Sequence, residues 1–179
     1  MDMHSCSDQA ITLAAIAPFA DGPVHITGIS HIRLQESDRI AAIVENLTAL
    51  GVKVLEEQDA VIIYPVAGNL QAAEIQTHDD HRLAMGFALV GLRSPGVTIV
   101  DPKCCRKTFE NYFEVLEQVV HRIEGGAEEE VDEEDDSYTA SSGSTDDEDT
   151  EWEANLLSKD ADLFGVSIIG EQTNQPAPH

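Results

Sequence analysis

A change of composition near Gly125-Gly126 limits how much of this chain can fold around a core. Residues 1–123 carry 9 Lys or Arg and 16 Asp or Glu, whereas residues 124–179 carry 1 and 18. The stretch EEEVDEEDDSYTASSGSTDDEDTEWE has no helical or strand periodicity and few apolar side chains. Such a segment buries too little apolar surface to offset the entropy lost on folding. The sequence therefore predicts one folded domain over residues 1–123 and a disordered acidic tail over residues 124–179.

The acidic tail has two interpretations. The first is a solvating extension whose like charges repel one another. The second is an interaction module, because Ser144 and Thr145 precede DDED, a string typical of acidic-kinase targets. The final stretch, residues 154–179, contains apolar side chains that indicate a small helix or a docking segment, but it is too short for a core of its own.

The overall charge and the cysteines exclude some classes of protein. The formal net charge of -24 and the isoelectric point near 4.3 oppose binding to nucleic acid or an anionic membrane through bulk charge. No apolar stretch reaches the roughly 18 residues needed to span a bilayer, and we find no signal-peptide pattern at the N-terminus. The cysteines number 3 and two are adjacent, which favours a reduced, intracellular setting over a disulfide framework.

The apolar pattern of the first 123 residues predicts an α/β fold, in which helices pack on sheets. Apolar side chains at helical spacing predict helices over residues 7–19, 36–50, 80–92 and 109–123. Short β-branched or alternating runs predict strands over residues 23–29, 52–57, 60–65, 72–77 and 96–100.

Charged side chains gather where three of these helices begin. Glu36 and Arg39 open one helix, His81 and Arg82 open the next, and Lys107 precedes the last. Helix N-termini attract anions through their free N–H groups and the helix dipole. Cations at three such starts indicate a site for a strongly anionic small ligand. The acids among them indicate proton transfer as well as binding.

Simpler roles for these charges stay open. Each charge taken singly is equally compatible with a helix-dipole contact or a simple ion pair. The run His78-Asp79-Asp80-His81 contains metal-ligand types, but its spacing matches no closed zinc pattern, so capping or anion binding is favoured. Cys104 and Cys105 fit buried or bystander thiols better than nucleophiles, and we find no P-loop and no G-x-G-x-x-G motif.

Four strings in the first 123 residues resemble EPSP synthases, the 3-phosphoshikimate 1-carboxyvinyltransferases, in the order and spacing of that family. They are DMHSCSD (2–8), RLQESDRIAAIVENLTALG (33–51), EIQTHDDHRLAMGFALV (74–90) and TIVDPKCCRKTFENYF (98–113). The resemblance covers only the C-terminal third of a full-length enzyme. It implies part of an inside-out α/β domain built from βαβαββ units. It also implies transfer of the enolpyruvyl group of phosphoenolpyruvate to the 5-hydroxyl of shikimate 3-phosphate, with no metal or organic cofactor.

The resemblance also implies roles for single residues. Asp8 matches the family's general base and shikimate-binding acid, and Glu36 matches the donor of a proton to the phosphoenolpyruvate methylene. The other matching positions are substrate-binding: His31, Gln35, Arg39, His81, Arg82 and Lys107. Arg39, Arg82 and Lys107 match the cations that hold the carboxylate and phosphate, and His81 matches a residue that orients Arg82 or the ligand. Gln35 and His31 depart from the Lys and Asn common in relatives.

The family motifs of the opposing wall of the cleft are absent from these residues. We therefore expect negligible enolpyruvyl transfer by this chain alone. A separate N-terminal EPSP synthase chain is one possible partner, beside the two small-molecule substrates. The alternative is a non-catalytic fragment that works as a binding protein through its acidic tail. The implied location is the cytoplasm, or a plastid if the source is a photosynthetic eukaryote.

Overall fold

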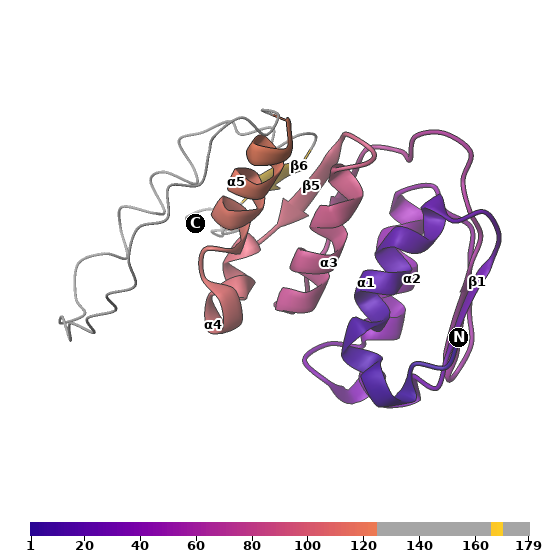
Figure 1. The fold of residues 1–179 in the computed structure, drawn as a ribbon. Helices are drawn as coiled ribbons and strands as arrows, with labels where there is room; N and C mark the ends of the chain where they lie inside the picture. The colour runs from indigo at the N-terminus through magenta and orange to yellow at the C-terminus, as the bar shows by residue number, and fades with distance from the viewer. Residues whose placement is uncertain (125–165, 170–179) are drawn as a thin grey trace, which may run out of the picture. The chain divides into compact units, whose positions relative to one another are not determined.

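The computed structural model describes the backbone of residues 1–124 and 166–169 and the side chains of residues 1–121 (Figure 1). The described residues fall into two units: Met1–Tyr112 together with residues 166–169, and residues 113–124. The disordered tail was predicted over residues 124–179, of which residues 125–165 and 170–179 lie outside the described residues. None of the described helices is long and apolar enough to cross a membrane.

The first sheet of the larger unit is antiparallel and has β3 (Ala60–Ile63) at its centre. Strand β1 (Val24–Thr27) pairs with it on one side and β2 (Val54–Glu56) on the other. Three of the four residues of β3 are buried, as expected of a central strand. The first residues of the chain follow the free edge of β1, where Met3 N donates to the Thr27 carbonyl oxygen at 2.9 Å.

The second sheet is parallel and has the order β4-β5-β6. Its strands are β4 (Ala73–Ile75), β5 (Val97–Val100) and β6 (Val166–Ile169). Strand β6 comes from the end of the chain, where the sequence indicated a small helix or a docking segment. The structure makes these four residues a strand that pairs with β5 along its whole length, so a helix is wrong for residues 166–169, and the rest of that stretch lies outside the described residues. The β-branched run Val-Ser-Ile-Ile favours this extended form.

Three helices of the larger unit lie side by side in Figure 1. They are α1 (Ala10–Ile16), α2 (Arg39–Ala49) and α3 (His81–Gly91). Their apolar faces form the core, in which Ile11, Ile43, Leu47, Leu83 and Phe87 are fully buried. Gly86 allows α1 and α3 to approach closely, because a Cβ atom at this position would lie 3.0 Å from Cγ2 of Ile11.

Several predicted elements differ from the observed ones. The helix predicted over residues 7–19 is α1 flanked by 3-10 turns at His4–Gln9 and Ala17–Phe19. The helix predicted from residue 36 begins at Arg39, because the Asp38 side chain accepts a hydrogen bond from Ala41 N and caps it there. A 3-10 turn, Ser30–Leu34, precedes it and was not predicted.

The last predicted helix, residues 109–123, is two helices in the structure. They are α4 (Arg106–Phe109) and α5 (Tyr112–Glu124), and a 3-10 turn at Pro102–Cys105 precedes them. Asp101 starts this turn in a left-handed conformation, with φ of 51°. The α/β class predicted from the sequence is confirmed, while its finer assignment to an inside-out domain stays a prediction.

Candidate active site

A buried ion pair joins the starts of α2 and α3. Arg39 Nε donates to Asp80 Oδ2 at 2.7 Å and Arg39 Nη2 to Asp80 Oδ1 at 3.2 Å. The side chain of Arg39 is 3% exposed and that of Asp80 is 0% exposed. Asp80 also caps α3 by accepting from Arg82 N at 3.0 Å, and Ser37 Oγ donates to it at 3.1 Å. These contacts fix the orientation of the Arg39 guanidinium before any ligand binds.

The environment of Asp80 keeps its carboxylate charged. Burial alone would raise the pKa of this carboxyl. The hydrogen bonds and the charge of Arg39, with hydrogen bonds from Arg82 N and Ser37, outweigh burial and hold the pKa below its ordinary value. Asp80 is therefore a permanent counter-charge for Arg39 rather than a proton donor.

Asp8 connects the two arginines of the site. Arg39 Nη1 lies 3.2 Å from Asp8 Oδ1, and Arg82 Nη2 lies 3.0 Å from Asp8 Oδ2. Asp8 belongs to the 3-10 turn that precedes α1, and half of its side chain is exposed. Gln35 also accepts a hydrogen bond from Arg39 Nη1. The guanidinium of Arg39 therefore has one edge in the core and one edge toward the solvent side of the site.

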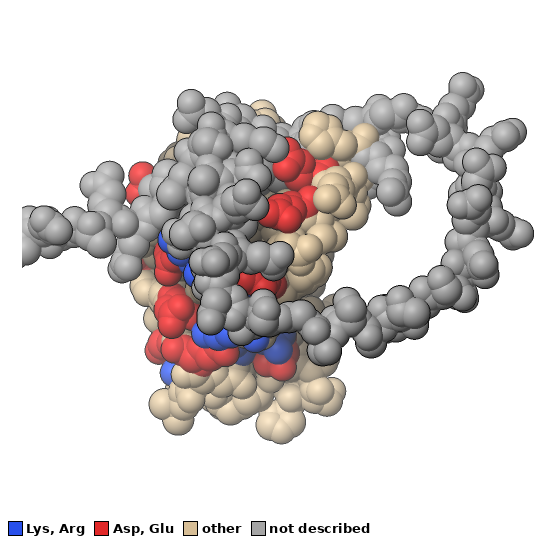
Figure 2. All heavy atoms as spheres, turned by 90° about the vertical axis from the view of Figure 1, so that its left-hand side faces the viewer, with Lys and Arg blue, Asp and Glu red and all other residues tan. Residues whose placement is uncertain are grey.

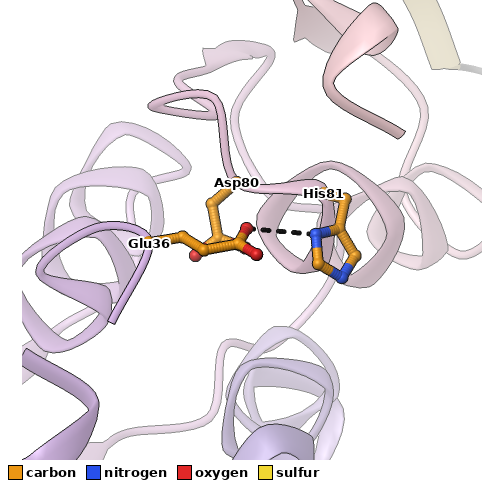
Figure 3. A group of neighbouring side chains, drawn as sticks. All are labelled: Glu36, Asp80 and His81. Atoms are coloured by element: carbon orange, nitrogen blue, oxygen red, sulfur yellow. Dashed lines mark hydrogen bonds and ion pairs between the residues drawn. The ribbon is translucent and has the colours of Figure 1, made fainter. Parts of the chain in front are cut away.

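Glu36 lies at the centre of the second part of the site, where it contacts His81 and Lys107. Its Oε2 lies 3.1 Å from His81 Nδ1, the contact drawn in Figure 3, and 3.2 Å from Lys107 Nζ. Partial desolvation lowers the pKa of Lys107, but the hydrogen bond and charge of Glu36 outweigh it, so the pKa is raised and the amine stays protonated. A carboxylate, an imidazole and an ammonium group thus meet beside the arginines.

The loop before α3 takes a conformation that side chains seldom adopt. His78 and Asp79 have φ of 49° and 55°, so two consecutive non-glycine residues are left-handed. This turn directs the Asp79 carbonyl oxygen to Lys107 Nζ, which donates to it at 3.0 Å. His78 Nε2 lies 2.8 Å from Glu45 Oε2 on α2. The strained turn is therefore hydrogen-bonded both to Lys107 and, through Glu45, to α2.

The cluster contains seven of the eight residues predicted as site residues: Asp8, Gln35, Glu36, Arg39, His81, Arg82 and Lys107. His31 lies apart from these ion pairs. Its Nε2 is 2.7 Å from Ser7 Oγ, and its ring is 5.2 Å from that of His4. Ser37 and the Asp79 carbonyl were not predicted from the sequence. Ser37 stands between two motif acids and could have been noticed, whereas a backbone carbonyl leaves no trace in the sequence.

A groove leaves the ionic cluster along α1, α3 and α4, with a volume of about 360 Å³. Its lining includes the site residues Asp8, His81 and Arg82 and then Met85, Leu89 and Phe109. Figure 2 shows one charged face of the molecule, on which Lys and Arg are mixed with Asp and Glu.

Glu36, Asp80 and His81 also bring potential metal ligands within 4.8 Å of one another. Figure 3 shows their side chains converging from the start of α3 and the segment before α2. Both Asp80 oxygens already bind Arg39, and Lys107 lies against Glu36. A metal ion would have to compete with two fixed cations, so the donor set fits an anionic ligand better.

The fold and this cluster define an α/β protein in which Arg and Lys side chains pair with carboxylates at the helix starts. A family model described as EPSP synthase (3-phosphoshikimate 1-carboxyvinyltransferase) matches residues 1–116. The chain therefore belongs to the EPSP synthase family.

The comparisons with single proteins agree with this family. A 3-phosphoshikimate 1-carboxyvinyltransferase 2 of Halalkalibacterium halodurans is 50% identical over 119 residues, 66% of this chain and 27% of that protein. A chloroplastic relative from Nicotiana tabacum is 47% identical over 118 residues, 66% of this chain and 23% of that protein. The structure of EPSP synthase from Acinetobacter baumannii matches with a TM-score of 0.59 at 29% identity, over 63% of this chain and 27% of that chain. The chain thus spans about a quarter of the length of these relatives.

Proposed function

We propose that this chain supplies one wall of an EPSP synthase active site. In the full reaction, the 5-hydroxyl oxygen of shikimate 3-phosphate attacks C2 of phosphoenolpyruvate, and the C3 methylene accepts a proton. The resulting tetrahedral adduct then loses inorganic phosphate and a methyl proton, which restores the enol double bond. The single observation that carries the proposal is the pairing of two acids with separate cations: Asp8 with Arg39 and Arg82, and Glu36 with Lys107.

The cations suit phosphoenolpyruvate, a compact polyanion. Arg39 and Arg82 present guanidinium groups that bind carboxylate or phosphate oxygens in pairs, and Lys107 adds a point charge. In the described structure, the carboxylates of Asp8 and Glu36 form ion pairs with these cations. The anionic groups of the substrate would replace these carboxylates. The buried bond between Arg39 and Asp80 keeps the arginine in place during that exchange.

The two acids suit the two proton transfers. Asp8 is assigned as the base that takes the hydroxyl proton, and Glu36 as the donor to the methylene carbon. Glu36 must be protonated to donate, and loss of water from a closed cleft would raise its pKa. His81, 3.1 Å from Glu36, is assigned as the residue that orients this acid and the ligand. His31 and Gln35 are assigned to shikimate 3-phosphate, as the family resemblance implies.

The proposed active site needs a second wall, on the opposite side of the substrates from these residues. Transition-state binding needs groups on both sides of the substrates, and this chain spans about a quarter of its relatives. We assign the missing wall to an N-terminal EPSP synthase polypeptide on a separate chain. The fold assigned to residues 1–123 is accordingly part of an inside-out α/β domain of βαβαββ units. The assigned location is the cytoplasm, or a plastid, as the name of the tobacco relative states for that protein.

The test is co-expression of the full chain with the part of the Halalkalibacterium halodurans relative that precedes the matched region. Phosphate release that requires both phosphoenolpyruvate and shikimate 3-phosphate is the expected result. Glu36→Gln should lower its rate by roughly 10²–10⁴. The matched control is Glu74→Gln, on an exposed residue of β4, which should leave the rate unchanged. Substrate-dependent release that survives Glu36→Gln at full rate would refute the assigned chemistry.

A further inference from the structure

Strand β5 lies in the middle of its sheet only because β6 pairs with one of its two sides (Figure 1). On the other side β5 pairs with β4, over Val97 to Ile99. The parallel register with β6 joins Val97 to Val166 and Val100 to Ile169, so it covers the whole of β5. Displacement of residues 166–169 would therefore turn β5 into an edge strand.

The sequence of β5 lacks the features that protect exposed edge strands. Its residues, Val-Thr-Ile-Val, are all β-branched and uncharged. Edge strands are commonly kept from pairing with another chain by a charge, a proline, a bulge or a covering segment. Val97 and Ile99 are buried, whereas Thr98 and Val100 are half-buried. An uncovered β5 would offer a row of free N–H and C=O groups on a strand with high β-propensity.

The other sheet edges among the described residues are protected in other ways. The first residues of the chain cover β1, where Met3 N donates to the Thr27 carbonyl oxygen. Strand β2 carries Glu56 and strand β4 carries Glu74, and both acids are exposed. Strand β5 therefore depends on β6 for the protection that the other edges receive from a charge or from the N-terminal segment.

We infer that β6 is a covering strand that keeps the edge of β5 from pairing with the β5 of a second copy of this chain. Two copies related by a twofold axis would place their β5 strands antiparallel, so Val97–Val100 would form a self-complementary ladder. Pairing of β6 within one chain does not depend on protein concentration, whereas pairing between copies does. The net charge of -24 opposes the approach of two copies, and added salt screens this repulsion. The wild type should therefore be monomeric, and loss of β6 pairing should produce a dimer that salt strengthens.

The experiment uses the full chain and measures its mass in solution by sedimentation equilibrium over a range of protein and salt concentrations. The double variant Ser167→Pro/Ile168→Pro removes two consecutive N–H groups of β6. Consecutive residues of a strand turn their N–H groups to opposite sides, so one of the two faces β5. We expect the dimer dissociation constant of this variant to be at least about tenfold below the lower limit set by the wild type, and to fall further as salt is added.

Three further variants separate the covering role from other effects. The matched control Ser141→Pro/Ser142→Pro places the same two prolines in the acidic stretch and should stay monomeric. Thr98→Lys, added to the proline variant of β6, places a charge on the uncovered edge and should restore the monomer. Ser167→Gly/Ile168→Gly keeps both N–H groups and lowers only the β-propensity, so it should give an intermediate dissociation constant. Circular dichroism checks that each variant is folded.

Hydrogen exchange tests the uncovered edge directly. At concentrations at which the proline variant of β6 is monomeric, the amides of residues 97–100 that face β6 should exchange at least about tenfold faster than in the wild type. Amides of β3, in the other sheet, should keep their wild-type rates.

Each outcome supports or overturns the covering role of β6. A folded proline variant that stays monomeric while the β5 amides lose protection overturns it, because the edge then needs no cover. Amides that stay protected in the monomer also overturn it, because β6 then does not hold the edge. A dimer that persists with Thr98→Lys overturns it, because the second copy then attaches elsewhere. An unchanged dissociation constant in the glycine variant, which decides the question if the proline variant fails to fold, overturns it as well. None of these measurements involves phosphoenolpyruvate or enolpyruvyl transfer, so the covering role is tested independently of the proposed function.

Discussion

Arg39 and Asp80 form a two-bond ion pair in which both side chains are almost completely buried, and this pair joins the starts of α2 and α3. The same guanidinium extends one nitrogen to Asp8 in the exposed part of the site. A buried charge is tolerated when it is paired and fully hydrogen-bonded. The stability of the core and the geometry of the charged cluster are therefore linked through one side chain.

Asp80→Ala should destabilise the protein strongly, because it leaves the Arg39 charge buried without its partner. The expected loss is about 3–5 kcal/mol in the free energy of unfolding. Urea denaturation monitored by circular dichroism measures it. Asp21→Ala, at an exposed turn residue, is the matched control and should change the free energy by less than about 0.5 kcal/mol. Equal losses in both variants would contradict the assigned role of the pair.

The ion pair of Arg39 and Asp80 should also make the free energy of unfolding depend on pH in acid. The pKa of Asp80 is lowered in the folded state, so its contribution to stability is fully present above the unfolded value of about 3.9. That contribution is lost as the pH falls through the lower, folded pKa. The free energy of unfolding of the wild type should therefore fall over the acid interval below about pH 4. Asp80→Asn should show a shallower fall over this interval, and an identical slope would count against the pair as its source.

The ion pair of Arg39 and Asp80 could be predicted only in part from the sequence. The start of α3 was predicted to within one residue, whereas α2, which Asp38 caps, begins three residues later than predicted. The motifs also grouped the charged residues that the structure brings together. The pairing of Arg39 with Asp80 spans 41 positions and depends on how α2 and α3 pack, which local periodicity does not encode.

Further features could not be predicted, for different physical reasons. The 3-10 turns at Ser30–Leu34 and Pro102–Cys105 are too short to produce a periodic signal. Strand β6 has only four residues and acquires its place from pairing with β5, a long-range contact. The groove arises from α1, α3 and α4 together, so no single helix indicates it.

Gly86→Ala should destabilise the contact between α1 and α3. Alanine gains about 1 kcal/mol over glycine in helix propensity, but its Cβ would lie 3.0 Å from Cγ2 of the fully buried Ile11. Overpacking of this kind costs about 1–3 kcal/mol, so we expect a net loss of roughly 1 kcal/mol by thermal or urea unfolding.

Ile11→Leu removes the branch that the new Cβ would meet. In a double-mutant cycle, Gly86→Ala should therefore cost less in the Ile11→Leu background than in the wild type. A coupling energy indistinguishable from zero would mean that the two helices accommodate the methyl group elsewhere.

Arg82→Lys should impair the assembled site although the charge is kept. Lysine cannot present two parallel donors to a carboxylate or phosphate, so we expect kcat/KM for phosphoenolpyruvate to fall at least about tenfold in the complex with the partner polypeptide. Arg93→Lys, at an exposed position just after α3, is the matched control and should keep the wild-type value. A normal kcat/KM in Arg82→Lys would remove this residue from the substrate contacts.

Phosphate release from phosphoenolpyruvate and shikimate 3-phosphate is the most direct test of the claim that this chain holds one wall of a two-walled site. The rate is measured for the chain alone, for the partner polypeptide alone and for the two together. We expect release only when both polypeptides are present, with a rate that follows the concentration of their complex. Release by this chain alone at the rate of the mixture would contradict the two-walled site.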